Sequence, residues 1–168
     1  IKILMIKIIT TESGGPAAIG VLKSSKLSKR NIKTISCDVN NLAAGLYYSD
    51  ESETVPSFDD PQYMNKFIKL IKKYKPNILL PTGESDLNLI SEHSGLIEQL
   101  GCKVFISSPE TILLCQDKLK FYEKLKLHNI PQPITMGTYL IQKPRFGRGS
   151  KGVNKINLNK DLIQEYLP

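Results

Sequence analysis

Strand-like and helix-like patterns alternate along the first two-thirds of the chain. Short apolar runs predict strands at Ile1–Ile9, Ile32–Cys37, Ile78–Leu80 and Val104–Ile106. Helix patterns follow these runs and begin after Ser13-Gly14-Gly15-Pro16, at Asp60-Pro61, at Leu87 and at Ser108-Pro109-Glu110. Repeated βα units of this kind require a parallel sheet with helices on both faces. We therefore expect an α/β fold, a Rossmann-like parallel-sheet domain.

The helix predicted after Asp60-Pro61 has the clearest periodicity. Its apolar residues recur at i, i+3, i+4 and i+7, the spacing of one buried helix face, and they are Met64, Phe67, Ile68 and Ile71. Asp60 is expected to cap the first turn of this helix. The next helix is predicted as a single element over Leu87–Leu100.

Ligands of a doubly wound sheet gather at the carboxyl ends of its strands. In this chain that edge would carry the Gly14–Gly15 turn, Asp38 and the Pro81–Asp86 loop. We expect Gly15 and Glu84 to contribute to a substrate site there, with Glu84 holding the substrate that is not a nucleotide. The alternative for Glu84 is a negative charge that stabilises the start of the following helix.

The turn from Gly14 to Gly20 also raises the alternative of a nicotinamide cofactor, with Asp38 as the ribose contact of a dehydrogenase. However, its glycine spacing departs from the G-x-G-x-x-G fingerprint. Close packing of a helix on a strand accounts for these glycines equally well. Asp38 could then simply cap the next turn.

The pattern changes after Cys115. Asp117 is expected to cap a helix, and the breaker-rich segment His128–Pro133 ends it. One face of this helix would carry Leu119, Tyr122 and Leu125. We therefore place a domain boundary near Asp117, with one domain at 1–116 and a second at 117–168.

A glycine loop in the second domain points most directly to chemistry. It contains a G-x-G-x-x-G pattern formed by Gly147, Gly149 and Gly152. The surrounding basic residues are Lys143, Arg145, Arg148 and Lys151. Glycines let backbone N–H groups approach an anion closely, and the basic side chains supply compensating charge. This combination is typical of a site for a polyphosphate.

The residues after the loop decide what kind of phosphate site it would be. Val153, Ile156 and Leu158 predict a strand, whereas a dinucleotide fingerprint needs a helix there. The loop is therefore expected to join two strands and to close over nucleotide phosphates. A flexible basic hairpin on the surface is the alternative.

Charge and cysteine usage restrict the partners and the compartment. The net charge of +7 is scattered over lysines that form no run and have no interleaved aromatic residues, so we expect no nucleic-acid partner. No apolar run reaches the ~18 residues of a membrane span, and we expect no membrane partner. Cys37, Cys102 and Cys115 are predicted to be buried, reduced thiols, which indicates the cytoplasm.

Several motifs occur in the order seen in ATP-grasp enzymes: Asp117-Lys118, Asn129-Ile130-Pro131-Gln132-Pro133, Lys143-Pro144 with the Gly147–Gly152 loop, and Gln164-Glu165-Tyr166-Leu167-Pro168. The first part is similar to the domain that precedes the ATP-grasp in carbamoyl-phosphate synthase large subunits, through the segments Gly14–Gly20, Ala43–Asp50 and Pro81–Glu84. The chain thus resembles a Rossmann-like pre-ATP-grasp domain followed by a partial α+β ATP-grasp subdomain.

The resemblance implies an ATP-dependent ligase that activates a carboxylate as an acyl phosphate for attack by an amine-type nucleophile. Both substrates would be small molecules. The nucleotide-binding residues that it implies are Lys118, Lys143, Arg148, Gly149, Ser150, Gly152, Gln164, Glu165 and Leu167. Lys118 and Lys143 would offset the charge on the transferring phosphoryl group. The resemblance identifies no catalytic residue in this chain and leaves the assembly open, a homodimer included.

Two departures from the family bear on activity. The family's Mg²⁺ ligands follow the Gln-Glu-Tyr-Leu segment, so we expect them beyond Pro168 and expect the chain alone to be inactive. Between Ile134 and Lys143 the family has a longer passage with a helix, where this chain has only Thr135–Gln142. A deletion or residues missing from the sequence would explain this, and the abrupt join favours missing residues. A non-catalytic nucleotide-binding or regulatory module is the alternative to the ligase.

Overall fold

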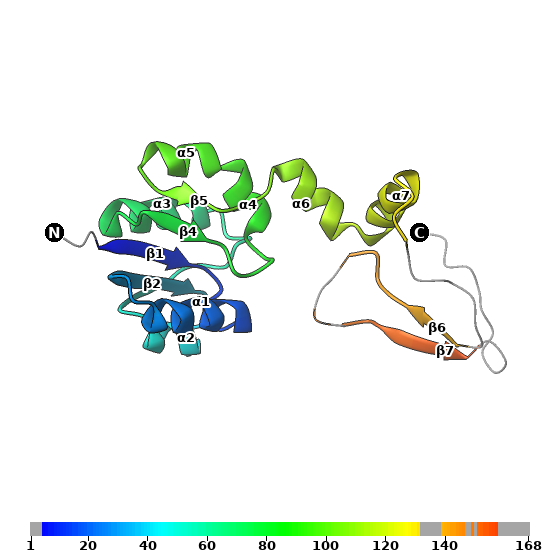
Figure 1. The fold of residues 1–168 in the computed structure, drawn as a ribbon, viewed down its shortest axis with the longest axis horizontal. Coiled ribbons are helices and arrows are strands. Elements are labelled where there is room, and N and C mark those ends of the chain that lie inside the picture. Colours follow the sequence, from blue (N-terminus) through cyan, green and yellow to red (C-terminus); the bar gives the residue numbers. More distant parts are fainter. Residues whose placement is uncertain (1–4, 132–138, 147–148, 150, 158–168) are drawn as a thin grey trace. The chain divides into compact units, whose positions relative to one another are not determined.

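A computed structural model of the chain describes residues 5–131, 139–146, 149 and 151–157 (Figure 1). The chain divides into two compact units, Ile1–Pro109 and Glu110–Pro168, and each is described by itself. The predicted boundary between functional domains, near Asp117, stays a prediction.

The first unit is built on a parallel sheet of five strands, as expected for the α/β fold. The strands are β1 (Ile6–Thr10), β2 (Ile32–Asp38), β3 (Glu51–Thr54), β4 (Ile78–Leu80) and β5 (Lys103–Val104), in the order β3-β2-β1-β4-β5. Ile9 of β1 lies beside Ile35 of β2 and Leu79 of β4. The chain therefore leaves β1 on one side and crosses to the other side after β3, which makes the carboxyl ends of β1 and β4 neighbours.

Helices cover both faces of this sheet (Figure 1). They are α1 (Pro16–Leu27), α2 (Ala44–Tyr48), α3 (Tyr63–Tyr74), α4 (Leu87–Glu92) and α5 (Ser94–Gln99). The main core joins the sheet residues Ile9 and Ile35 to α3, α4 and α5. On α3, Phe67 and Ile71 are buried, and Met64 and Ile68 pack partly against the core, which confirms the predicted stripe.

Helix α3 begins slightly later than its sequence suggests. The Asp60 carboxylate accepts from the backbone N–H of Gln62 at 2.7 Å, and the Asp60 carbonyl accepts from the N–H of Tyr63 at 2.9 Å. These bonds make a turn, so Asp60 organises the approach to the helix, whose N-cap position belongs to Gln62. The expectation that Asp60 caps the helix directly was therefore wrong by two residues.

The predicted helix over Leu87–Leu100 is divided into α4 and α5 at His93. The ring of His93 lies 2.8 Å from the carbonyl oxygen of Leu89, and the hydroxyl of Ser94 donates to the carbonyl of Ser91 at 2.8 Å. Side-chain bonds to backbone carbonyls compete with a regular helix and favour breaks. This competition is the physical reason why one periodic pattern gives two short helices.

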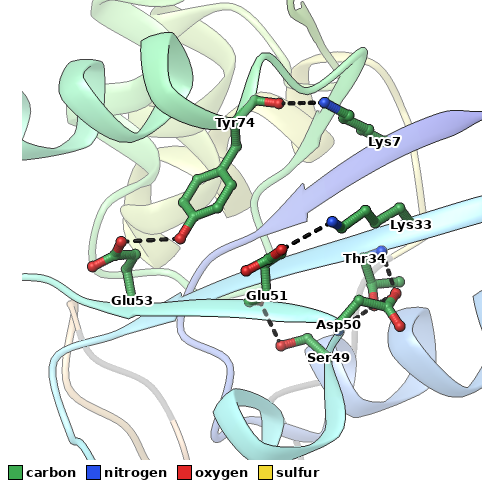
Figure 2. Close-up of polar contacts among 8 residues, drawn as sticks. All are labelled: Lys7, Lys33, Thr34, Ser49, Asp50, Glu51, Glu53 and Tyr74. Atoms are coloured by element: carbon green, nitrogen blue, oxygen red, sulfur yellow. Dashed lines mark hydrogen bonds and ion pairs between the residues drawn. The ribbon is translucent and has the colours of Figure 1, made fainter.

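Strand β3 is an edge strand that polar contacts hold in place (Figure 2). Glu51 forms an ion pair with Lys33 of β2 at 2.9 Å, and Glu53 accepts from the hydroxyl of Tyr74 at 3.0 Å. Just before β3, the Asp50 carboxylate accepts from both the N–H and the hydroxyl of Thr34 at 2.7 Å. Charged side chains on an edge strand also discourage pairing with another chain.

The short helix α2 packs on the turn after β1 with no room for a side chain at Gly45. The Gly45 N–H donates to the Ser13 carbonyl at 3.0 Å, and a Cβ added at Gly45 would overlap the Ser13 backbone. We expect Gly45→Ala to lower the free energy of unfolding by at least ~1 kcal/mol, measured by urea titration. Gly20→Ala is the matched control. It meets no atom within 4 Å on α1 and should stabilise by about 0.5–1 kcal/mol. Equal effects would contradict the prediction.

The second unit contains α6 (Pro109–Gln116) except for its first residue, α7 (Lys118–Leu127) and an antiparallel hairpin of β6 (Tyr139–Gln142) and β7 (Asn154–Asn157). The Asp117 carboxylate accepts from the N–H of Lys120 at 3.2 Å, which confirms the predicted cap of α7. Gln142 pairs with Asn154, so the glycine loop does join two strands. Within the described residues, no helix is long and apolar enough to cross a membrane.

Two of the three cysteines are buried as predicted. Burial raises the pKa of the Cys102 thiol to about 12 and that of Cys37 well above its usual value, so both remain thiols at neutral pH. Cys115 is exposed, which corrects its prediction. Helix α6 buries Ile112, and Cys115 lies on the exposed part of the helix with Leu113.

Candidate functional site

At the carboxyl edge of the sheet, the Gly14–Gly15 turn is tied to the end of β2. The Asp38 carboxylate accepts from the N–H of Gly14 and from the N–H of Asn40, both at 2.8 Å. Only 8% of Asp38 is exposed, and helix α2 packs against Ser13 beside the turn. Both carboxylate oxygens of Asp38 thus hold backbone in place, and these contacts favour the packing interpretation of the turn over a ribose site.

The loop after β4 is held by the two residues that follow β1. The hydroxyl of Thr82 donates to the carbonyl of Thr11. The N–H of Ser85 donates to the Glu12 carboxylate at 2.6 Å. A Cβ at Gly83 would overlap the Glu12 carboxyl group, so the glycine makes room for that side chain. The segments that follow β1 and β4 are therefore in direct contact, as the topology led us to expect.

A buried carboxylate ends this loop. Asp86 is 2% exposed and accepts from the hydroxyl of Tyr63 at 2.6 Å and from the hydroxyl of Thr11 at 3.4 Å. Burial raises the pKa of Asp86 against the opposing effect of these two donors, and the nearby Glu12 raises it further. Sequence reasoning assigned no role to Thr11, Glu12 or Tyr63, because only the fold brings α3 and β1 to this loop.

Glu84 and Gly15 both lie at this edge, as predicted from the topology. Glu84 is exposed, and Gly15 is the N-cap residue of α1. Helix α4 begins at Leu87 and has no acidic residue in its first turn. Glu84 lies two residues before Asp86, the N-cap residue. A negative charge stabilises a helix mainly within its first turn, so a charge at Glu84 should contribute little to α4. The substrate role of Glu84 and Gly15 remains a prediction.

In the second unit, the start of α7 is joined to the segment that leads into the glycine loop. The Arg145 guanidinium contacts both Asp117 carboxylate oxygens, with Nε at 2.9 Å and Nη2 at 2.8 Å. This pair holds the pKa of Asp117 at about 2, well below its usual value. Arg145 was expected to supply charge to a phosphate; its guanidinium binds Asp117, and a phosphate contact stays a prediction.

The same junction brings together two of the predicted phosphate ligands. The N–H of Lys118 donates to the carbonyl of Arg145 at 3.1 Å, and Lys143 lies two residues before Arg145 on the same segment. Lys118 is half-buried, whereas Lys143 and Lys151 are exposed. The backbone segments that carry Lys118 and Lys143 are thus close together, although the two residues are 25 positions apart in sequence.

The described part of the glycine loop has the backbone that its sequence requires. Gly149 and Gly152 adopt left-handed conformations with φ of 61° and 71°. A Cβ at Gly152 would lie 2.8 Å from Cγ of Pro144. The remaining predicted nucleotide ligands, Arg148, Ser150, Gln164, Glu165 and Leu167, lie outside the described residues, as does Gly147.

The donor set of this unit fits a polyphosphate. It offers the basic residues Lys118, Lys143 and Lys151, and the Asp117 carboxylate beside Lys118 is paired with Arg145. Left-handed glycines leave backbone N–H groups accessible to an anion. Among the described residues, no group of three or more His, Cys, Asp or Glu side chains could hold a metal ion.

Several solved structures share the fold of this chain. N5-carboxyaminoimidazole synthetase from Staphylococcus aureus, complexed with ADP, gives a TM-score of 0.60 at 19% identity over 96% of this chain and 44% of that chain. The biotin carboxylase domain of Hydrogenobacter thermophilus 2-oxoglutarate carboxylase, in complex with MgADP, ADP and bicarbonate, gives 0.61 at 17% identity over 92% of this chain and 38% of that chain.

L-amino acid ligase from Bacillus licheniformis gives a TM-score of 0.60 at 13% identity over 95% of this chain and 41% of that chain. The chain therefore spans less than half the length of these three structures. The five-stranded parallel sheet with its flanking helices matches the amino-terminal domain that precedes the ATP-grasp, which confirms the predicted fold class. No match was found among curated proteins.

A family model connects these observations to the sequence. The model described as PylC-like, N-terminal domain, matches residues 11–105, which include the β1 turn, the β4 loop and Asp86. Together with the solved structures, it confirms the resemblance to ATP-grasp enzymes that the motifs predicted. The match covers more than half of the chain, and the chain therefore belongs to the PylC-like N-terminal domain family.

Proposed function

We propose that this chain is the amino-terminal part of an ATP-dependent ligase that activates a small-molecule carboxylate as an acyl phosphate for attack by an amine-type nucleophile. The observation that carries the proposal is the junction at Asp117, Lys118 and Arg145, which joins α7 to the hairpin of the glycine loop. The family match and the similar solved structures, complexed with ADP in two cases, support the same assignment.

The residues of the second unit would act on charge and position. ATP, when bound, supplies the phosphoryl group that turns a carboxylate oxygen into a leaving group. Lys118 and Lys143 would neutralise phosphate oxygens, where fixed positive charge stabilises the transition state of phosphoryl transfer. The Asp117–Arg145 pair would hold the two lysine-bearing segments together.

The first unit would hold the other substrate. Its carboxyl edge carries Gly15 and the exposed Glu84, in the region where doubly wound sheets bind ligands. A reaction like that of carbamoyl-phosphate synthase is the finer form of the proposal. It rests on the segments Gly14–Gly20, Ala43–Asp50 and Pro81–Glu84.

A screen for ADP release by the full-length protein tests this function. Mg-ATP is supplied with single carboxylates, among them bicarbonate, amino acids and dicarboxylates, each with and without ammonia or a primary amine. We expect one carboxylate to stimulate ADP release, and hydroxylamine to trap its acyl phosphate as a hydroxamate. ATP binding without ADP release under any condition would instead support the regulatory module. Absence of ATP binding would refute both assignments.

Glu84→Gln tests the substrate role of the first unit. The variant removes one exposed negative charge and should reduce ligase activity of the full-length protein at least about tenfold, since a charge-assisted substrate contact is lost. ATP affinity and melting temperature should stay nearly unchanged. Glu92→Gln, an exposed glutamate at the end of α4, is the matched control and should keep full activity. A Glu84→Gln variant that only melts earlier would show a structural role.

A further inference from the structure

Three of the described residues other than glycine have a positive φ: Lys75 and Asn129 come at the ends of α3 and α7, whereas Glu12 lies between β1 and α1. The φ of Glu12 is 45°, in the left-handed region that side chains other than glycine rarely adopt. Such backbone conformations persist when the surrounding contacts determine them, and they concentrate at functional sites. Two of the contacts of Glu12 in this protein are to the N–H of Ser85, in the loop after β4, and to the N–H of Gly15, in the turn before α1.

Three contacts link this segment to the loop. The Glu12 carboxylate accepts from the N–H of Ser85 at 2.6 Å, and the carbonyl of Thr11 accepts from the hydroxyl of Thr82. The third contact is steric, since the Glu12 carboxyl group fills the space of a Cβ at Gly83. Glu84 lies between Gly83 and Ser85, so both of its neighbours in the chain are in contact with Glu12.

The arrangement differs from ordinary packing of a loop on a sheet. Glu12 is only half-buried, and a half-buried carboxylate could be satisfied by water without a strained backbone. The left-handed backbone of Glu12 instead serves two contacts at once: its carbonyl accepts from the N–H of Gly15 at 3.0 Å, and its carboxylate accepts from the N–H of Ser85. Thr11 in turn donates to the buried Asp86 at 3.4 Å, which fixes the far end of the same loop.

We propose that Glu12 is a positioning residue that fixes the loop of residues 82–85 and thereby sets where the Glu84 carboxylate meets the substrate that is not a nucleotide. This role rests on the proposed function of Glu84. Glu12 acts through the Ser85 N–H and the Gly83 backbone, and its effect should appear in the KM for that substrate rather than in ATP binding.

The chain offers variants that separate the side chain from the backbone. Glu12→Gly removes the carboxylate but tolerates the left-handed φ. Glu12→Gln keeps a side-chain oxygen that can accept from Ser85. Gly83→Ala introduces a methyl group that Glu12 must vacate, and no positive φ penalises alanine at that position. The double variant Glu12→Gly with Gly83→Ala has room for the methyl group again.

Two measurements on the full-length protein test the proposal. In amide hydrogen exchange, Glu12→Gly and Gly83→Ala should each exchange the Ser85 N–H at least about tenfold faster than wild type, and Glu12→Gln should stay near wild type. In the ADP-release assay, the first two variants should raise the KM of the stimulating carboxylate or amine about tenfold and change the KM of ATP less than about twofold.

The double variant supplies the sharpest outcome. Because the methyl group acts by displacing Glu12, adding Gly83→Ala to Glu12→Gly should cause no further rise in KM. Additive effects, or exchange at Ser85 that is unchanged in Glu12→Gly, would overturn the proposal. Failure of the proposed function is distinguished at once, because wild type would then release no ADP. The exchange measurement would still decide whether Glu12 fixes the loop.

Discussion

Lys118→Ala and Lys143→Ala are each expected to weaken ATP binding by the full-length protein about 10- to 150-fold. Each variant removes a charge-assisted contact to phosphate, worth about 1.5–3 kcal/mol, and 1.4 kcal/mol corresponds to a factor of ten in affinity. We expect an effect from both lysines because the hydrogen bond from the Lys118 N–H to the Arg145 carbonyl joins the two segments that carry them. Isothermal titration calorimetry measures the dissociation constants directly.

Lys124→Ala is the control for this prediction. Lys124 is an exposed lysine in the last turn of the same helix, α7, and its removal changes the net charge by the same amount. Its effect on ATP affinity should stay within about twofold, as for screened surface charges. If both test variants bound ATP like wild type, Lys118 and Lys143 would not be phosphate ligands, whatever the fold.

The elements that the sequence predicted well are those with a local apolar signal. Helix α3 repeats its apolar residues at helical spacing, and its buried face includes Phe67 and Ile71 as expected. Strand β3 has the sequence Glu-Ser-Glu-Thr and gives no such signal. Its backbone pairs with β2, and its glutamates bind Lys33 and Tyr74, which are 18 and 21 residues away. Long-range polar contacts of this kind cannot be read from periodicity.

The candidate site likewise has one feature that the sequence predicted and others that it did not. Topology rules predicted that the β1 turn and the β4 loop would share one edge, because parallel strands bring their carboxyl ends together. The contacts within that edge were not predictable, since Glu12 binds Ser85 across 73 positions. The Asp117–Arg145 pair was missed for a different reason. A basic residue beside a glycine loop suggests a phosphate ligand. Nothing in the local sequence indicates that Arg145 binds Asp117, the cap of α7, which lies 28 positions earlier.

Tyr63→Phe is expected to lower the free energy of unfolding by about 1–3 kcal/mol, the range for leaving a buried polar group without its hydrogen-bond partner. The Tyr63 hydroxyl donates to Asp86 at 2.6 Å, and Asp86 is 2% exposed, so water cannot easily replace the lost donor. Burial raises the pKa of Tyr63, which keeps the hydroxyl protonated. Tyr47→Phe is the control. Tyr47 is 74% exposed, and its variant should change stability by less than about 0.5 kcal/mol.

The pH dependence of stability distinguishes an electrostatic role of Asp86 from simple packing, because a loss of packing alone does not depend on pH. The pKa of Asp86 is raised in the folded protein by burial. Its contribution to stability is therefore fully present below the unfolded pKa of about 4 and is lost as the pH rises through the folded pKa. Asp86→Asn cannot ionise, so its stability relative to wild type should increase as the pH rises from about 4 to 7.

Tyr63→Phe should behave in the opposite sense. It removes a donor that lowers the pKa of Asp86, so it destabilises the ionised carboxylate more than the protonated one. Its cost should therefore be larger at pH 7 than at pH 4, as measured by urea titration at both values. A loss of stability that is the same at both pH values would mean that the Tyr63 hydroxyl acts through packing alone. The hydrogen bond from α3 would then not affect the ionisation of Asp86.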